Sequence, residues 1–246
     1  MDVDLLNHLV ENRRNPSRSS YDYLHLVDLR DALSHQLRHE RGLWLDFGTI
    51  VSPYAALMPN ATVETADLVS DAPEDLKPTY EFEIGEKCPA PDAHFDGLIS
   101  TQVLEHVDTP ANYLHEAHRM LRPGGRIVLS THGIWEDHPS PGDYHRWTTQ
   151  GLRRLLEEAG FAVDEVVPIT CGIRALSVLT LAYLRPLPWN SDSRTFRARM
   201  KILDYASLAV NSLLSLRQSD RFGTEGAIEG HSRLYVDVVV RGHKPR

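Results

Sequence analysis

The sequence predicts an alternating α/β protein with a mostly parallel sheet that helices cover on both faces. Seven short apolar runs recur along the chain, and segments with helical periodicity separate most of them. The chain has 246 residues, of which 41% are hydrophobic and 24% charged, as is typical of one globular domain. We therefore expect a single domain over residues 1–246.

The N-terminal segment, residues 1–41, has a helical pattern. Its leucines recur on one face, and Gly42 can end the helix. We interpret this segment as an N-terminal helical cap that packs on the sheet through Leu24, Leu26, Val27, Leu29, Leu33 and Leu37.

The apolar runs give the strands. From the first run onward they alternate with helical patterns, so consecutive strands are expected to be mostly parallel. The predicted strands are residues 43–47, 61–68, 79–84, 95–101, 126–131, 161–169 and 233–242.

Two of the intervening helices have recognisable ends. Thr109 and Pro110 are suited to the N-cap and first position of one helix. Thr148 or Thr149 can cap the next helix, and Gly160 can end it in a left-handed conformation.

Residues 170–232 break the alternation of strands and helices. Helical patterns at 173–184 and 194–217 are joined by a Pro-broken loop and followed by a Gly-rich loop. We interpret the segment as a helical insertion before the last strand. Neither apolar run reaches the ~20 residues needed to span a bilayer. The helices either pack on their own domain or form a homodimer contact through 173–217, a substrate lid or a membrane-surface contact.

Charge and cysteine content narrow the functional classes. A formal net charge of -8 gives no basic footprint for nucleic acid. Cys88 and Cys171 are far apart, which favours reduced thiols in a cytoplasmic protein, and the N-terminus lacks the features of a signal peptide. The 13 histidines show no metal-ligand spacing on a plausible helix, so no metal is expected.

The stretch "WLDFGTIVSPYAAL" (44–57) predicts a nucleotide-like ligand. A strand that ends in Gly48 and leads into a helix lets backbone N–H groups approach such a ligand. Asp67 lies 21 residues after Asp46, at the end of the second strand, where a carboxylate can accept both hydroxyls of a ribose. The alternative is a generic βαβ unit whose aspartate caps a helix.

Residues 95–133 read "FDGLISTQVLEHVDTPANYLHEAHRMLRPGGRIVLSTHG", and residues 143–161 read "DYHRWTTQGLRRLLEEAGF". Both stretches resemble class I S-adenosylmethionine-dependent methyltransferases of the methyltransferase type 11-like group. The "FD", "LEH" and "LxPGG" motifs carry the resemblance, which covers about residues 43–169. It implies a Rossmann-like, doubly wound, seven-stranded sheet of order 3-2-1-4-5-7-6 with an antiparallel last strand.

The resemblance also implies which residues bind S-adenosylmethionine. The first corner would face the methionine part, the acid after the second strand would hold the ribose, and the turns after the third and fourth strands would flank the adenine and the methyl group. These positions are Gly48, Thr49, Ser52, Asp67, Leu68, Glu86, Thr101 and Gln102.

The first corner is a degenerate version of the family's glycine-rich motif. Where the family has roughly Gly-x-Gly-x-Gly, this chain has Gly48, Ile50 and Ser52. The Ile50 side chain restricts the backbone and occupies space beside the cofactor. This motivates an alternative function, a methyltransferase-like protein without methyl transfer that acts as a partner or binding subunit, or catalyses another reaction such as a cyclisation in the same fold.

The leading hypothesis is O-methylation of a small hydroxylated acceptor: a sugar, a glycan or a natural product. The sulfonium is already activated, so alignment and a general base near neutral pKa suffice. Four histidines fall in loops at the carboxyl ends of strands, and of these we favour His132 and His145 as catalytic residues. We expect Asp143, Tyr144, Arg146 and Trp147 to shape the acceptor side, and Trp147 is equally suited to be a buried anchor for the following helix. A nicotinamide dehydrogenase is disfavoured because the "LEH" to "LRPGG" block has no role there.

Overall fold

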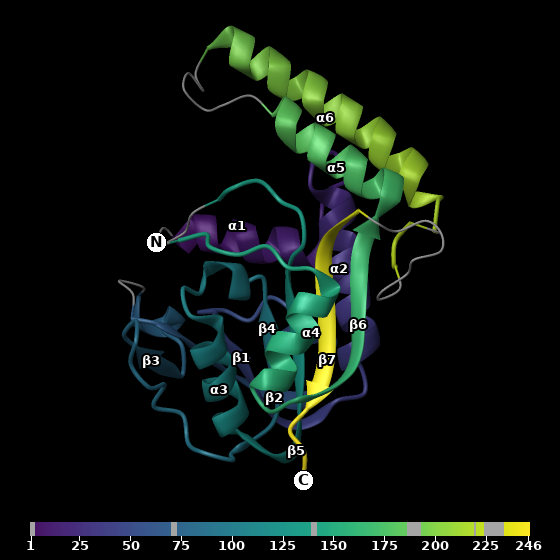
Figure 1. Cartoon of the computed structure of the whole chain (residues 1–246). Coiled ribbons are helices and arrows are strands. Elements are labelled where there is room, and N and C mark those ends of the chain that lie inside the picture. The colour runs from purple at the N-terminus through teal and green to yellow at the C-terminus, as the bar shows by residue number, and fades with distance from the viewer. Residues whose placement is uncertain (1–2, 70–72, 139–141, 186–192, 219, 224–233) are drawn as a thin grey trace.

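A computed structural model describes residues 3–69, 73–138, 142–185, 193–218, 220–223 and 234–246, and Figure 1 shows its architecture. The sheet has seven strands in the order β3-β2-β1-β4-β5-β7-β6, which confirms the predicted topology. The strands are β1 (Arg41–Phe47), β2 (Asn60–Leu68), β3 (Tyr80–Phe82), β4 (Phe95–Thr101), β5 (Leu121–His132), β6 (Ala162–Cys171) and β7 (Tyr235–His243).

All strands of the sheet run parallel except β7, the last strand in the sequence. Trp44 of β1 lies opposite Val63 of β2 and Gly97 of β4 in parallel register. β7 runs antiparallel between β5 and β6, and places Asp237 opposite His132. The carboxyl ends of β1, β2, β4 and β5 therefore share one edge, where open α/β sheets bind ligands.

Helices cover both faces of the sheet, as predicted (Figure 1). Successive strand residues point to opposite faces, so β4 sends Leu98 toward α3 and α4 and Ile99 toward α2. One hydrophobic core lies on each face of the sheet, and these two contain most of the buried apolar side chains; a smaller cluster joins α2, α5 and β7. The helices are α1 (Val3–Arg14), α2 (Tyr23–Leu37), α3 (Pro110–Met120), α4 (Thr149–Glu158), α5 (Gly172–Leu184) and α6 (Arg194–Ser215).

Several predicted boundaries change. The N-terminal helical segment is two helices, separated at residues 15–22. β5 begins at Leu121 rather than at 126, because the "RPGG" sequence is accommodated as an irregularity in the strand instead of a turn. Thr148 caps α4 by accepting a hydrogen bond from the Gly151 N–H at 3.1 Å, and Gly160 has a φ of 95°, both as predicted.

The prediction of a helix directly after the first corner is wrong. Only a single 3-10 turn, Ala55–Leu57, forms before β2 begins at Asn60. The connection is short and contains Pro53, which lacks an N–H donor and disfavours a helical conformation in the residue before it. The corner therefore has no α-helix N-terminus.

The insertion before β7 contains α5 and α6, which pack against each other and project beyond the sheet in Figure 1. Residues 186–192 of the predicted Pro-broken loop, and residues 224–233, which include most of the Gly-rich loop and the first predicted residue of the last strand, lie outside the described residues. Among the helices that are described, none is both long and apolar enough to cross a membrane.

The helices α5 and α6 form a helical hairpin, the α5–α6 hairpin. A buried aspartate attaches this hairpin to the sheet. Asp28 of α2 accepts hydrogen bonds from Arg174 of α5, at 2.7 and 2.9 Å, and from Arg221 at 2.7 Å. Thr170 at the end of β6 donates to the same carboxylate at 3.1 Å. Asp28 is fully buried and Arg174 is 1% exposed, so the carboxylate is the charge that makes burial of this guanidinium tolerable.

Replacing Asp28 with Asn tests this attachment. The substitution leaves a buried guanidinium without its counter-charge, so the free energy of unfolding, measured by urea denaturation, should fall by about 3–5 kcal/mol. Asp31→Asn is the matched control, because Asp31 also pairs with Arg221 but is partly exposed. It should cost no more than about 1 kcal/mol. Equal losses in the two variants would contradict this account.

Candidate functional site

A cleft of about 1400 Å³ opens at the carboxyl edge of the sheet. Its wall includes α1, the start of α2, the corner after β1, and the ends of β2 and β3. The opposite wall comes from the segments that follow β4 and β5 and from α3. The cleft is therefore built where the topology places the ends of the parallel strands.

Six of the eight predicted cofactor-binding residues line this cleft: Gly48, Thr49, Asp67, Leu68, Glu86 and Gln102. Two do not. The Ser52 hydroxyl donates to Asp46 Oδ2 at 2.5 Å, and Thr101 is the last residue of β4.

The first corner needs glycine for conformational and steric reasons. Gly48 has a φ of 93°, and a Cβ there would lie 2.5 Å from Val103 Cγ1. The N–H groups of Gly48 and Thr49 both donate to the Ala66 carbonyl, at 2.8 and 3.2 Å. These two donors are thus used by the fold, whereas the sequence suggested that they would face a ligand. Ile50 lines the cleft beside them.

Two acids stand near this corner. Asp67 lines the cleft and accepts a hydrogen bond from the Leu68 N–H at 2.8 Å; burial raises the pKa of its carboxyl. Asp46 is 1% exposed, and burial raises its pKa to about 7, although the Ser52 hydrogen bond and the Arg13 cation act in the opposite direction. The sequence analysis used Asp46 only as the position from which Asp67 was counted and predicted no function for it.

A buried carboxylate organises the other end of the cleft. Asp237 of β7 lies 2.5 Å from Nδ1 of His25 and 2.7 Å from Nδ1 of His132, and it accepts from Gln102 Nε2 at 3.0 Å. Burial alone would raise the pKa of Asp237, but the two imidazoles hold it below its usual range. Burial would likewise lower the pKa of His25, but Asp237 raises it above its usual value.

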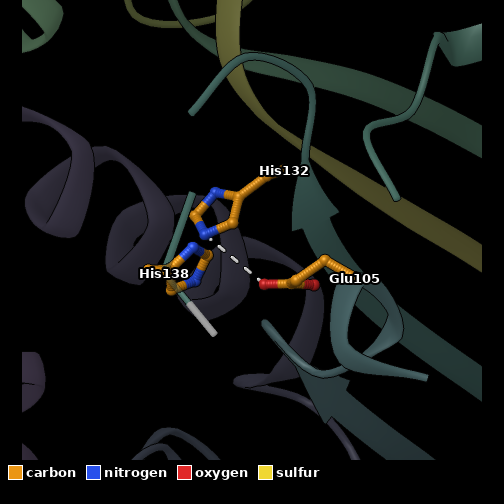
Figure 2. Close-up of side chains that lie close together, drawn as sticks. All are labelled: Glu105, His132 and His138. Atoms are coloured by element: carbon orange, nitrogen blue, oxygen red, sulfur yellow. Dashed lines mark ion pairs between the residues drawn. The ribbon is translucent and has the colours of Figure 1, made fainter. Parts of the chain in front are cut away.

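His132 is placed between two acids. Its Nδ1 faces Asp237, and its Nε2 lies 3.4 Å from Oε1 of the fully buried Glu105 (Figure 2). The Trp135 indole stacks on the His132 ring with centroids 5.4 Å apart. The His138 ring meets the His132 ring edge to face at 5.1 Å, and burial lowers the His138 pKa. These contacts fix the imidazole in the cleft.

The second predicted catalytic histidine lies elsewhere. His145 does not line the cleft, its backbone N–H donates to the Glu105 carbonyl at 3.3 Å, and its ring contacts Trp147. Nearby, Arg146 donates two hydrogen bonds of 2.6 Å to Asp143, which supports the loop. Only His132 of the favoured pair is brought to the cleft.

Sequence reasoning missed the acids and the histidine that surround His132. Asp237 and His25 lie more than 100 residues from it along the chain. The signal that could have located Asp237 is the register of β5 with β7, which sets it opposite His132. Glu105 was quoted only as part of the "LEH" motif, and no sequence spacing indicated that it meets His132 and His138.

Comparison with known proteins identifies the family. The model of a family described as a methyltransferase domain matches residues 20–166, more than half of the chain. The chain belongs to this family. The match confirms the resemblance found in the motifs, and it extends into the N-terminal cap, which the motifs did not cover.

Individual relatives are more distant. An uncharacterized 37.1 kDa protein in transposon TN4556 of Streptomyces fradiae is 34% identical over 154 residues, 52% of this chain and 44% of that protein. The O-methyltransferase resE of Aspergillus sclerotiorum is 28% identical over 121 residues, 45% of this chain and 46% of that protein. The chain thus matches less than half the length of either relative.

A solved structure shares the fold. It is a SAM-dependent methyltransferase, possible histamine N-methyltransferase, from Thermotoga maritima, with a TM-score of 0.53 and 18% identity over 98% of this chain and 96% of that chain. At this identity the likeness concerns the fold, and it agrees with the observed strand order of the methyltransferase family.

The raised pKa of Asp46 predicts a pH-dependent stability. Because the folded pKa is about 7 and the unfolded value is about 3.9, the folded protein holds this proton more tightly. The stabilising effect is complete below pH ~4 and is lost as the pH rises through ~7.

Asp46→Asn should remove this contribution. Between pH 5 and pH 8 the free energy of unfolding of the wild type should fall by an amount on the order of a few kcal/mol, because a shift of one pKa unit corresponds to about 1.4 kcal/mol. The variant should lack this loss, so its stability relative to the wild type should be higher at pH 8 than at pH 5. Urea denaturation of both proteins at the two pH values measures the difference. The same pH dependence in both proteins would show that Asp46 does not titrate in this range.

Proposed function

We propose that this protein is an S-adenosylmethionine-dependent O-methyltransferase that acts on a small hydroxylated acceptor. The observation that carries the proposal is one cleft with two different ends. Asp67 lies on the wall formed by the ends of β1 to β3, and His132, held by Asp237, lies at the end of β5.

The Asp67 end suits an adenosyl group. A carboxylate at the end of β2 can accept both ribose hydroxyls, and Leu68 and Glu86 lie on the same wall for the adenine. Thr49 and Gln102 line the space between this wall and the histidines, where the methionine part and the methyl group would lie. These assignments fit the side chains that the cleft presents.

The altered corner changes how the cofactor would be held. Since the Gly48 and Thr49 N–H groups are used by the Ala66 carbonyl, the amino-acid part of the cofactor would be bound by side chains. Arg13 and Asn12 of α1 line the cleft. A guanidinium pairs well with a carboxylate, so we assign Arg13 to the methionine carboxylate.

The acceptor end is suited to removing a hydroxyl proton. Asp237 binds the Nδ1 side of His132 at 2.7 Å and so favours a proton on that nitrogen, which leaves a lone pair on Nε2. An acceptor hydroxyl beside Nε2 would give its proton to the ring as the oxygen attacks the methyl carbon. The C–S electron pair would return to sulfur and leave S-adenosylhomocysteine.

The acceptor class follows from the lining of this end. Trp135 and Tyr144 offer aromatic surfaces, and His106 and Gln102 offer hydrogen-bonding groups. Such a mixture suits a sugar, a glycan or a hydroxylated natural product. An O-methyltransferase among the relatives supports transfer to oxygen. A cytoplasmic location fits the buried cysteines Cys88 and Cys171, which are not joined in a disulfide.

A second candidate function is a partner or binding subunit without methyl transfer. The occupied N–H groups of Gly48 and Thr49 favour it, as do exposed apolar side chains on the α5–α6 hairpin, among them Tyr183 and Leu216. A homodimer through 173–217 would cover this surface. A wild-type protein that forms a stable dimer and does not bind the cofactor would support this candidate over the first.

Cofactor binding tests the proposal at Asp67. Isothermal calorimetry should show binding of S-adenosylmethionine in the micromolar range, and Asp67→Ala should weaken it about 10–100-fold, because hydrogen bonds to a charged group contribute about 1.5–3 kcal/mol. Glu74→Ala, which removes an exposed carboxylate outside the cleft, should leave affinity unchanged. Wild-type protein that binds neither S-adenosylmethionine nor S-adenosylhomocysteine would refute the proposal.

Activity tests His132. With a panel of phenols and monosaccharides as acceptors, formation of S-adenosylhomocysteine by His132→Gln should be about 10²–10⁴-fold slower than by the wild type. His115→Ala is the control, since His115 is exposed and also lines the cleft. Equal rates for His132→Gln and the wild type on an accepted substrate would remove His132 from the mechanism.

A further inference from the structure

Three side chains from separate segments converge at the acceptor end of the cleft. Glu105 lies in the 3-10 turn Leu104–His106 after β4, His132 ends β5, and His138 follows in the next loop. One potential ligand atom from each lies within 4.8 Å of the other two. Figure 2 shows the three side chains pointing toward one another.

The Nδ1 atom of each imidazole has an oxygen partner. Nδ1 of His132 lies 2.7 Å from Asp237 Oδ1, and Nδ1 of His138 lies 3.1 Å from the Glu136 carbonyl oxygen. Metal-binding histidines usually donate the other ring N–H to a carboxylate or a carbonyl in this way, which fixes the tautomer and the ring orientation. The outer contacts expected of two metal ligands are thus both present.

The Glu105 carboxylate has one oxygen available to bind a metal ion. Glu105 is fully buried, and its Oε2 accepts from the Thr131 hydroxyl at 2.7 Å. Its Oε1 has no hydrogen-bond donor in the described part of the chain, which is costly for a buried carboxylate oxygen. Oε1 lies 3.4 Å from His132 Nε2. Two ligands of one tetrahedral ion, with bonds of about 2.1 Å, would lie about 3.4 Å apart.

We propose that Glu105, His132 and His138 form a binding site for a divalent transition metal ion of the zinc and iron(II) class. Two imidazoles and one carboxylate favour these ions over Mg²⁺ and Ca²⁺, which prefer oxygen ligands. His132 and His138 line the cleft, so a position left open by three protein ligands would face the acceptor.

The ion would change the acceptor chemistry, and this consequence rests on the function proposed above. The acceptor hydroxyl would occupy the open position and lose its proton to solvent at near-neutral pH, because the ion lowers its pKa. Its oxygen would then attack the methyl carbon, and the C–S electron pair would return to sulfur. In the metal-bound protein His132 holds the ion, and in the metal-free protein Nε2 is available as a base.

The alternative for the same cluster is a metal-free contact in which His132 lies directly between Glu105 and Asp237. Metal binding separates the two without any activity measurement. Chelator-treated protein should bind one Zn²⁺ per chain in isothermal calorimetry, with Mg²⁺ binding at least 100-fold weaker. Co²⁺ should give the visible absorption of a four- or five-coordinate site.

Variants locate the ion. His138→Ala, chosen because His138 is only partly buried, and Glu105→Gln should each weaken Zn²⁺ binding about 100-fold and remove the Co²⁺ absorption. His115→Ala should bind Zn²⁺ like the wild type, and circular dichroism checks that the variants fold. Wild-type protein that does not bind Zn²⁺, or binding that His138→Ala leaves unchanged, overturns the site. Because the readout is metal binding, failure of methyl transfer would leave the site standing.

Discussion

The buried carboxylate of Asp237 is the constraint on which the acceptor end depends. A desolvated negative charge must be paired, and here His25 from α2, His132 from β5 and Gln102 from the end of β4 surround it. The antiparallel β7 brings Asp237 to the carboxyl edge of the sheet beside the end of β5. β7, which lies between β5 and β6, therefore also sets the tautomer and the direction of the His132 imidazole.

The N-terminal cap is coupled to the same edge through α2. His25 binds Asp237, and Asp28, almost one turn further along α2, binds Arg174 of the α5–α6 hairpin. α2 thus carries two buried ionic contacts within one turn, one toward the acceptor end and the other toward the insertion. α1 also lines the cleft, and the positive charge of its Arg13 lowers the pKa of Asp46, against the effect of burial.

The fold could be predicted because it follows from local patterns. Apolar runs and helix caps located the strands and helices, the family resemblance carried by the "LEH" and "LRPGG" motifs implied the strand order, and Gly160 ends its helix as expected. The site was only partly predictable, since it depends on contacts between distant segments. Ser52 was expected to face the cofactor, but it bonds Asp46, and Asp237 became visible only once β5 and β7 were paired. The missing helix after Gly48 reflects a connection too short to form one.

The central claim is that one cleft brings a cofactor ribose to Asp67 and a methyl group to His132. A crystal structure with bound S-adenosylhomocysteine tests this claim most directly. The account predicts both ribose hydroxyls on the Asp67 carboxylate and the sulfur directed toward the space beside His132 Nε2. Density for the ligand away from Asp67, or a sulfur directed away from His132, would contradict it.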